Sequence, residues 1–292
     1  MKEEIYILRE QESFELYDIF ECGQCFRWDK NQDGSYTGVI KSGILNVKKD
    51  IEKNQIIIKG KIYDNENIEN IVRNYFDLDT NYNQIKQILS QVDIHLEESI
   101  KFGNGIRILN QDFWETIISF IISANNNIPR IKKIIEKLSQ KYGNEIEWDG
   151  KKYYTFPTPE NLSKATAQDL RNLGLGFRDK RINKTTQMIF LKEIDIDDIS
   201  KIKDTNKLRE ELLKLDGVGS KVADCILLFA LHRFDVFPID VWVRRVMNDL
   251  YIHNEDEEKV KKEDIKKLAK EKFKEYQALA QQYLFYWRRQ KN

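Results

Sequence analysis

The sequence predicts an α+β protein, in which an N-terminal antiparallel β-sheet domain is followed by two mainly α-helical domains. Three observations support this fold class. Apolar and polar residues alternate through residues 1–60, with Gly, Asn and Asp at sharp turns between the runs. From about residue 65 the apolar residues recur at helical spacing instead. A chain of 292 residues can also bury two or three separate cores. We expect the domains at residues 1–103, 104–212 and 213–292.

Within the first domain, four runs carry the strand pattern and three carry the helix pattern. The strand runs are residues 13–20, 24–29, 35–49 and 54–60. The helical runs, which flank the sheet, are residues 67–78, 81–90 and 92–102.

Helical spacing dominates from Asp112 onward. A buried helix ends at three asparagines, and Ile128 and Pro129 begin another that runs to about Tyr142, because proline suits a first helical turn. The remaining segments are a polar loop at 143–160, a helix at 159–173, a glycine turn at 173–176, a charge-dense solvated helix or insertion at 252–272, and a last helix at about 275–290.

Residues 215–225, LDGVGSKVADC, combine a tight glycine turn with the start of an apolar helix. Gly217 and Gly219 flank Val218, and glycine permits the positive φ and the close approach that such a turn requires. A helix that begins here leaves unpaired amide groups beside its positive dipole end, which is a place for a phosphate. An ordinary αα-hairpin is the alternative interpretation, because glycine is common where helices end.

Two charged residues near this turn could carry chemistry. Lys221 opens the apolar helix, where burial and the positive helix end both disfavour an ammonium group, and a neutral lysine is a nucleophile. The alternative is a solvated lysine, although helix N-termini favour acidic residues. Asp240 follows Pro238 and is expected to cap the next helix, where contact with amides keeps a carboxylate ionised. Because a nearby carboxylate favours a charged lysine, the balance at Lys221 stays open.

The segment LDGVGSKVADC followed by FPIDV resembles the helix–hairpin–helix and Gly/Pro–Asp signature of base-excision DNA glycosylases. Within that superfamily the chain is similar to the 8-oxoguanine DNA glycosylases that also act as lyases, the branch marked by a lysine at position 221. The resemblance extends over about residues 14–287. It implies an active-site cleft between the domains, with Lys221 as the nucleophile that forms a Schiff base and Asp240 as the catalytic carboxylate.

The resemblance also implies a pocket for a base extruded from the duplex. Cys225, one helical turn after Lys221, would stack on one face of the base and Phe285 on the other. Gln281, in the run AQQYLF, would read the Watson–Crick edge. Gly23, in the run ECGQCFRW, would offer its carbonyl to the hydrogen that 8-oxoguanine has at N7 and guanine lacks. Without the resemblance, the cysteine and phenylalanine are core residues, the glutamine lies at the core boundary and the glycine at a strand edge.

Further DNA contacts follow from the resemblance at two segments. The run NNNIPR at 125–130 is similar to the family's N-N-N-I-x-R, although asparagines also commonly end helices. The similarity places Asn125 in the space left by the flipped nucleotide and Arg130 against the stranded cytosine. Arg178 would support that contact, and Phe177 would act as a wedge.

Phosphate contacts are expected at the glycine turn. Backbone amides near Gly217 and Gly219 would hold a phosphate, and whether a monovalent cation joins them is open. Trp242 stands where some family members have a histidine that touches phosphate, and its side chain can donate only an indole N–H.

The charge distribution and the cysteine content indicate which partners and cofactors to expect. Residues 1–99 carry a net charge of −7 and the rest of the chain +7, which suits a nucleic-acid-binding face on the later part. Three cysteines make neither a disulfide framework nor a four-cysteine cluster, and Cys22 and Cys25 lack a second pair for zinc. We therefore expect no metal and no other cofactor.

The sequence also bears on partners and location. No apolar run approaches the roughly 20 residues that cross a bilayer, and the N-terminus lacks the apolar core of a signal peptide. We expect a cytoplasmic monomer, associated with the nucleoid or, in a eukaryote, nuclear, that makes no membrane contact. Its expected partner is double-stranded DNA containing 8-oxoguanine.

The leading interpretation is a bifunctional glycosylase and apurinic-site lyase that removes 8-oxoguanine opposite cytosine. One alternative is a glycosylase for alkylated or mispaired bases. Another is a non-catalytic module that uses the hairpin as a phosphate clamp. Binding alone does not require Lys221, Cys225 and Gln281 together, which favours an enzyme.

Overall fold

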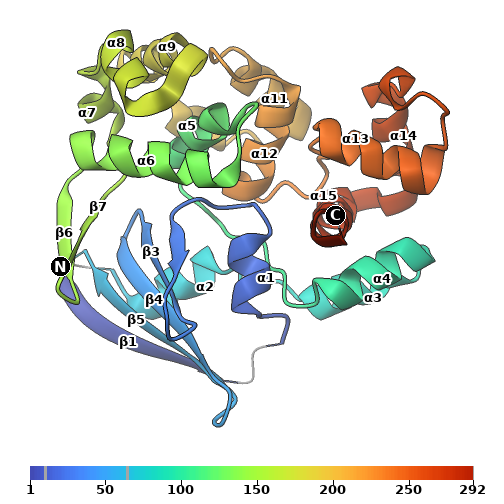
Figure 1. Ribbon diagram of the computed structural model, residues 1–292, viewed down its shortest axis with the longest axis horizontal. Helices are drawn as coiled ribbons and strands as arrows, with labels where there is room; N and C mark the ends of the chain where they lie inside the picture. The colour runs from blue at the N-terminus through green and yellow to red at the C-terminus, as the bar shows by residue number, and fades with distance from the viewer. Residues whose placement is uncertain (10–11, 64–65, 292) are drawn as a thin grey trace.

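The computed structural model describes residues 1–9, 12–63 and 66–291. In this part of the chain a five-stranded β-sheet occupies one end and helices form most of the rest (Figure 1), which confirms the predicted α+β class. Among the described residues, every helix is too short or too polar to span a lipid bilayer.

The larger sheet of the described residues has five antiparallel strands in the order β1-β5-β4-β3-β2. Their bounds are β1 (Lys2–Arg9), β2 (Trp28–Lys30), β3 (Tyr36–Ile40), β4 (Gly43–Asp50) and β5 (Gln55–Ile62). Strands β2 to β5 form a meander, and β1 pairs with β5 at one edge, with Lys2 opposite Ile62. One face of the sheet shares a buried core with α1 (Leu16–Glu21) and α2 (Ile68–Tyr75), which lie beside it in Figure 1.

The prediction of a strand at residues 13–20 is wrong, because the chain forms helix α1 there. Leu16, Ile19 and Phe20 are three and four residues apart and are all buried in the sheet core, which is the spacing of one helix face. The alternation of apolar and polar residues in the same run concealed this spacing.

The other predictions for the first third are closer to the structure. The run 24–29 contributes only its last two residues to a strand, because β2 begins at Trp28. The three helical runs are confirmed as α2, α3 (Tyr82–Ser90) and α4 (Ile94–Phe102). The predicted onset of helical spacing near residue 65 falls outside the described residues.

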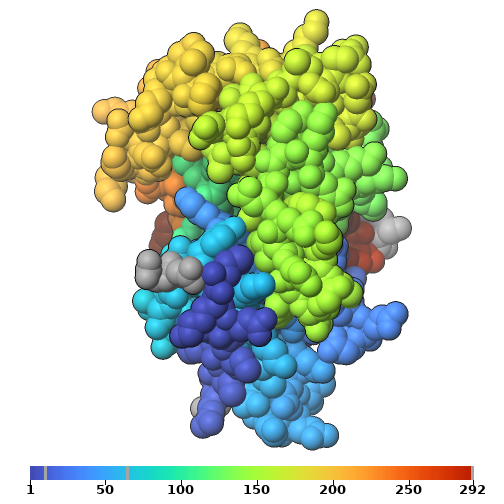
Figure 2. Space-filling model, turned by 90° about the vertical axis from the view of Figure 1, so that its left-hand side faces the viewer, coloured from blue at the N-terminus to red at the C-terminus, as the bar shows by residue number. Residues whose placement is uncertain are grey.

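Residues 143–160, predicted as a polar loop, contain the hairpin of β6 (Glu145–Trp148) and β7 (Lys151–Tyr154), so this prediction is wrong. Asp149 and Gly150 at its tip both have positive φ, and such two-residue turns match the twist of antiparallel strands. The hairpin packs Ile146 on Val39 and Ile44 of the five-stranded sheet. Figure 2 shows the yellow-green hairpin running down beside the blue strands.

The later helices make up the rest of the described fold. In order they are α5 (Phe113–Ser123), α6 (Ile128–Tyr142), α7 (Pro159–Ser163), α8 (Ala167–Leu170), α9 (Asp179–Phe190), α10 (Ile196–Ser200), α11 (Thr205–Leu213), α12 (Ser220–Leu231), α13 (Val241–Met247), α14 (Lys262–Phe273) and α15 (Gln277–Lys291).

Two of these regions differ from prediction. The helix expected at 159–173 is divided, because Thr166 and Asp169 form a capping box that begins α8. The charge-dense segment 252–272 is not wholly solvated, because α14 buries Ile265 and Ala269 in the helical core.

Two large buried cores and a smaller third one lie in the described chain. Leu96 and Ile100 of α4 belong to the large helical core, together with Tyr283 of α15, and not to the sheet core. Figure 1 shows α4 lying beneath α15. The boundaries at 103 and 212 stay predictions.

Candidate active site

One cavity of about 60 Å³ brings together six of the predicted residues. They come from the α1–β2 loop, from α12, from the start of α13 and from α15, and they are Gly23, Lys221, Cys225, Asp240, Gln281 and Phe285. The cavity therefore joins residues near both ends of the chain with the residues beside the glycine turn.

Lys221 lies in the first turn of α12, which begins at Ser220. Its side-chain nitrogen Nζ lies over the ring of Phe120, 5.3 Å from the centroid, and the side chain is half-buried. The face of an aromatic ring stabilises a cation, whereas the helix N-terminus disfavours one. The geometry directs the amine into the cavity, and its predicted neutral state stays a prediction.

Asp240 has two neighbours that suit the two roles considered for it. Its Oδ1 accepts a hydrogen bond from the amide of Val243 at 2.8 Å, so the side chain is the N-cap of α13. The same residue lines the cavity with Lys221. Capping fixes the orientation of the carboxylate and does not remove it from the cavity.

Cys225 and Phe285 contribute soft and aromatic surfaces to the cavity. Cys225 is 4% exposed, and burial raises the pKa of its thiol to about 11, although nearby Lys221 opposes the shift. The sulfur is therefore a neutral, polarizable contact surface at physiological pH. Phe285 is half-buried and follows Gln281 by one helical turn on α15. Stacking of a base between the two side chains stays a prediction.

Gln281 and Gly23 supply polar groups. Gln281 is 5% exposed, and no described residue forms a hydrogen bond with its side-chain amide, which leaves that amide available to a ligand. Gly23 has φ of +90°, a conformation that other residues rarely adopt. The backbone conformation alone therefore explains why residue 23 is glycine, whether or not its carbonyl contacts a base.

Several cavity residues were missed by the sequence analysis. Phe120 and Phe229 stack with their centroids 5.4 Å apart and line the cavity. Gln282 donates from Nε2 to the carbonyl of Cys22 at 3.0 Å, which holds the chain just before Gly23. Gln282 lies in the run AQQYLF, but the resemblance gave a role only to its neighbour Gln281. Phe120 lies in the apolar run of α5, whose spacing is that of ordinary core residues.

The glycine turn has the geometry of a helix–hairpin–helix between α11 and α12. Gly217 has φ of +88°, and a Cβ there would lie 3.1 Å from Cβ of Arg181 and from Cγ2 of Ile121. Val218 is buried, as expected. Gly219 is the N-cap of α12, no side chain caps this helix, and the space around Gly219 is open. The first-turn amides are therefore free to hold a phosphate.

Three predicted DNA contacts lie on the surface. Asn125, in the turn after α5, is exposed and has φ of +51°, which asparagine tolerates. Arg130 is exposed and donates from Nη2 to the carbonyl of Gly174 at 3.3 Å. Phe177 is 53% exposed, which suits a wedge.

Arg178 does not project into solvent with them. It is only 2% exposed, and its guanidinium donates to the carbonyls of Ala124, Asn125 and Leu175. The described conformation thus uses Arg178 to hold the segment that carries Asn125. Direct support of a cytosine contact stays a prediction and requires these bonds to open. Trp242 is 42% exposed and lies 5.8 Å from the guanidinium of Arg245.

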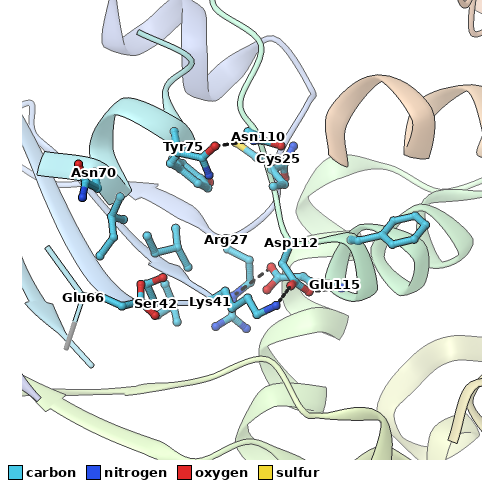
Figure 3. Close-up of a pocket in the computed structure, with 16 residues that line it drawn as sticks. Cys25, Arg27, Lys41, Ser42, Glu66, Asn70, Tyr75, Asn110, Asp112 and Glu115 are labelled. Carbon is cyan, nitrogen blue, oxygen red and sulfur yellow. Dashed lines mark hydrogen bonds and ion pairs between the residues drawn. The ribbon is translucent and has the colours of Figure 1, made fainter. Parts of the chain in front are cut away.

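A larger cavity of about 450 Å³ lies elsewhere, between the β3–β4 hairpin, α2 and the start of α5 (Figure 3). Lys41 pairs with Asp112 at 3.1 Å, and Arg27 lies 3.9 Å from Glu115. Burial raises the pKa of Glu115 to about 7, although Arg27 opposes the shift. None of the six predicted pocket residues lines this cavity, so its greater size does not make it the reaction site.

The described residues also bear on metal binding. They contain no group of three or more His, Cys, Asp or Glu side chains that could hold a metal ion. Cys22 and Cys25 are buried, and their thiols donate to the carbonyls of Ile19 and Phe20.

Comparison with known proteins matches both parts of the chain to families. Residues 6–117 match the 8-oxoguanine DNA glycosylase N-terminal domain, and residues 118–275 match the HhH-GPD superfamily of base excision DNA repair proteins. The chain is 34% identical to an N-glycosylase/DNA lyase of Saccharomyces cerevisiae over 79% of this chain and 66% of the relative. It is 32% identical to a probable N-glycosylase/DNA lyase of Methanothermobacter thermautotrophicus over 72% and 70%. The chain thus spans about two thirds of the length of these relatives.

Solved structures agree over nearly full length. The 8-oxoguanine glycosylase/lyase of Clostridium acetobutylicum, in complex with double-stranded DNA containing cytosine opposite 8-oxoguanine, is 40% identical. Its TM-score is 0.91, with 100% of this chain and 99% of that chain covered. Its apo-form gives 41% identity and a TM-score of 0.89, with 98% and 97% covered.

The fold and the cavity therefore define a member of the HhH-GPD superfamily of base excision DNA repair proteins. Within that superfamily the chain belongs to the 8-oxoguanine DNA glycosylase family, the branch that carries this N-terminal domain ahead of the helical part.

Proposed function

We propose that this protein is a bifunctional DNA glycosylase and apurinic-site lyase that removes 8-oxoguanine from duplex DNA opposite cytosine. The observation that carries the proposal is the convergence of six residues on one cavity beside the glycine turn. A phosphate clamp alone would need the turn, but it would not need a lysine, a carboxylate and an unpaired glutamine amide in a shared pocket.

The geometry suggests an order of events on DNA. The amides at the start of α12 hold the backbone, and exposed Phe177 enters the duplex where the damaged nucleotide leaves the stack. The extruded base then contacts Cys225 and Phe285 on its faces and Gln281 at its edge. The carbonyl of Gly23 accepts a hydrogen bond from the N7 hydrogen that distinguishes 8-oxoguanine. With guanine in the pocket this carbonyl would have no donor, which would weaken the binding of guanine by about 1–3 kcal/mol.

The chemistry then needs two groups. The lone pair of Lys221 Nζ attacks the anomeric carbon, and the glycosidic bond breaks so that its electrons leave with the base, which takes up a proton. Asp240 stabilises the positive charge that develops on the sugar. Loss of a proton from the attached nitrogen and opening of the sugar ring give a Schiff base. Removal of a neighbouring proton then expels the 3′ phosphate by β-elimination.

The cavity must enlarge before a base can enter. A volume of about 60 Å³ is well below the roughly 300 Å³ at which small-molecule pockets begin. Phe285 is half-buried and reaches the cavity from α15, so rotation of its side chain is the simplest way to open it.

The proposal includes the setting of the reaction. The partner is double-stranded DNA, bound by a monomer. The protein acts where genomic DNA lies, which is the cytoplasm of a prokaryote, in contact with the nucleoid, or the nucleus of a eukaryote.

Borohydride trapping tests the proposal. Reduction in the presence of an 8-oxoguanine·cytosine duplex should join wild-type protein to DNA, and Lys221→Gln should abolish the adduct. Lys262→Gln is a matched control, because Lys262, like Lys221, lies in the first turn of a helix but is exposed and outside the cavity. Trapping that persists in Lys221→Gln rejects the assigned nucleophile.

A lesion panel separates the alternatives. Wild-type protein should release 8-oxoguanine faster than alkylated or mispaired bases. Faster release of another lesion would support the glycosylase alternative. Salt-sensitive binding with every base left in place would support the non-catalytic module.

A further inference from the structure

Arg289, on α15, lies behind two walls of the base pocket. Its guanidinium donates a hydrogen bond to the carbonyl of Glu21. The same group lies over the ring of Phe285, 5.5 Å from the centroid. A Cβ at Gly23 would lie only 3.0 Å from Nη1 of Arg289, so the guanidinium also contacts the glycine. One side chain therefore touches both the segment that presents the Gly23 carbonyl and the aromatic wall opposite Cys225.

Two neighbours on the same face of α15 give this contact a rigid base. Gln282 donates to the carbonyl of Cys22 at 3.0 Å, and the hydroxyl of Tyr286 donates to Oδ1 of Asp18 at 3.0 Å. Residues 282, 286 and 289 are four and three positions apart, so they share one side of the helix. Both neighbours hold α15 to the N-terminal segment, and the guanidinium of Arg289 in addition lies over the ring of Phe285.

We propose that Arg289 is a positioning residue of the base pocket, which holds the Gly23 backbone and the Phe285 ring in the arrangement that receives an oxidised purine. The inference rests on the proposed function, because it assigns both walls to lesion binding. A guanidinium suits this task because its edge donates to a carbonyl while its planar face stacks on an aromatic ring. Lysine can make the hydrogen bond without the planar contact.

The test compares two reactions of the same protein. Excision of 8-oxoguanine needs the base pocket, whereas cleavage of a preformed abasic site needs Lys221 but has no base to position. Arg289→Ala should slow single-turnover excision by on the order of tenfold to a hundredfold, because small misplacements of reacting groups have effects of this size. Cleavage of abasic DNA should stay within about twofold of wild type, and Arg289→Lys should restore part of the excision rate.

Arg288→Ala is the matched control. Arg288 is the preceding residue of α15, but its guanidinium pairs with Asp249 at 2.8 Å, whereas that of Arg289 donates to the carbonyl of Glu21. Removal of the Arg288 side chain should leave both reactions unchanged, which separates the position of Arg289 from a general loss of positive charge near DNA.

A double-mutant cycle with Gly23 gives a second, independent readout. A methyl group in Gly23→Ala would displace the guanidinium, because 3.0 Å is too close for an ordinary contact and the arginine end can move. Adding Arg289→Ala to Gly23→Ala should therefore slow excision less than Arg289→Ala does in the wild-type background.

The outcomes separate the inference from the function on which it rests. Equal loss of excision and abasic-site cleavage in Arg289→Ala overturns the positioning role in favour of folding or DNA binding. Unchanged excision also overturns it, as does full additivity in the cycle. Wild-type protein that leaves 8-oxoguanine in place contradicts the proposed function and the inference together.

Discussion

The carboxylate of Asp240 accepts a hydrogen bond from the amide of Val243 at 2.8 Å, and the same side chain lines the cavity that holds Lys221. The cap of α13 therefore fixes the direction of the carboxylate in the pocket. A structural and a chemical role coincide in one residue, and suitable substitutions can separate them.

Asp240→Asn should retain the cap and lose the charge. Asparagine caps helices about as well as aspartate, so the thermal midpoint should change little. Excision should fall by on the order of a hundredfold to a thousandfold, the effect of removing one group that stabilises charge in a transition state. Asp240→Ala should lose activity and also about 1 kcal/mol of stability. An Asp240→Asn variant that excises 8-oxoguanine at the wild-type rate contradicts the chemical role.

Gly23→Ala should impair removal of 8-oxoguanine more than removal of any other lesion that the protein accepts. A residue with a side chain at φ of +90° is strained by about 1–3 kcal/mol and would shift the carbonyl. Excision rates over a lesion panel measure this, with Gly34→Ala as control, since Gly34 also has positive φ but has open space around it. A uniform loss across the panel would contradict lesion recognition by the Gly23 carbonyl.

Arg178→Ala should destabilise the free protein. The carbonyls of Ala124, Asn125 and Leu175 lose their donor, and leaving a buried one such as that of Leu175 unpaired costs about 1–3 kcal/mol. Urea unfolding measures the change, and exposed Arg130→Ala, with one hydrogen bond at 3.3 Å, should alter stability much less. If Arg178→Ala unfolds like wild type and alters excision only opposite cytosine, the residue acts on DNA directly.

Glu115 should make stability depend on pH. Burial raises its pKa from 4.5 to about 7, so the folded state holds the proton more tightly than the unfolded state. The tighter binding of this proton stabilises the folded state. The stabilisation is fully present below pH about 4.5 and is lost as pH rises through about 7.

Glu115→Gln should remove that dependence. From pH 5 to pH 8, the free energy of unfolding of the variant should rise relative to that of wild type by about 1–3 kcal/mol. Because the Glu115 side chain is 16% exposed to water, we expect a value near the lower end of this range. Urea unfolding at the two pH values checks this, with exposed Glu98→Gln as control. Parallel pH profiles for wild type and Glu115→Gln would contradict the assignment.

Much of the fold could be predicted because it depends on neighbouring residues. Helices such as α3 and α6 follow from local apolar spacing and capping side chains. The same local reasoning failed at α1, where alternation and helical spacing coexist in one run and packing against the sheet selects the helix. The β6–β7 hairpin was missed although Asp149 and Gly150 are a recognised turn pair.

The sequence by itself determined the glycine turn, the lysine in the first turn of α12 and the capping aspartate, because each depends on residues close together in the chain. The family pattern added Gly23, Gln281 and Phe285. Only the tertiary structure decided that Arg178 is buried against carbonyls and that Arg289 joins Glu21 to Phe285. Such contacts join residues far apart in sequence, and their geometry follows from the packing of whole elements, which no local pattern encodes.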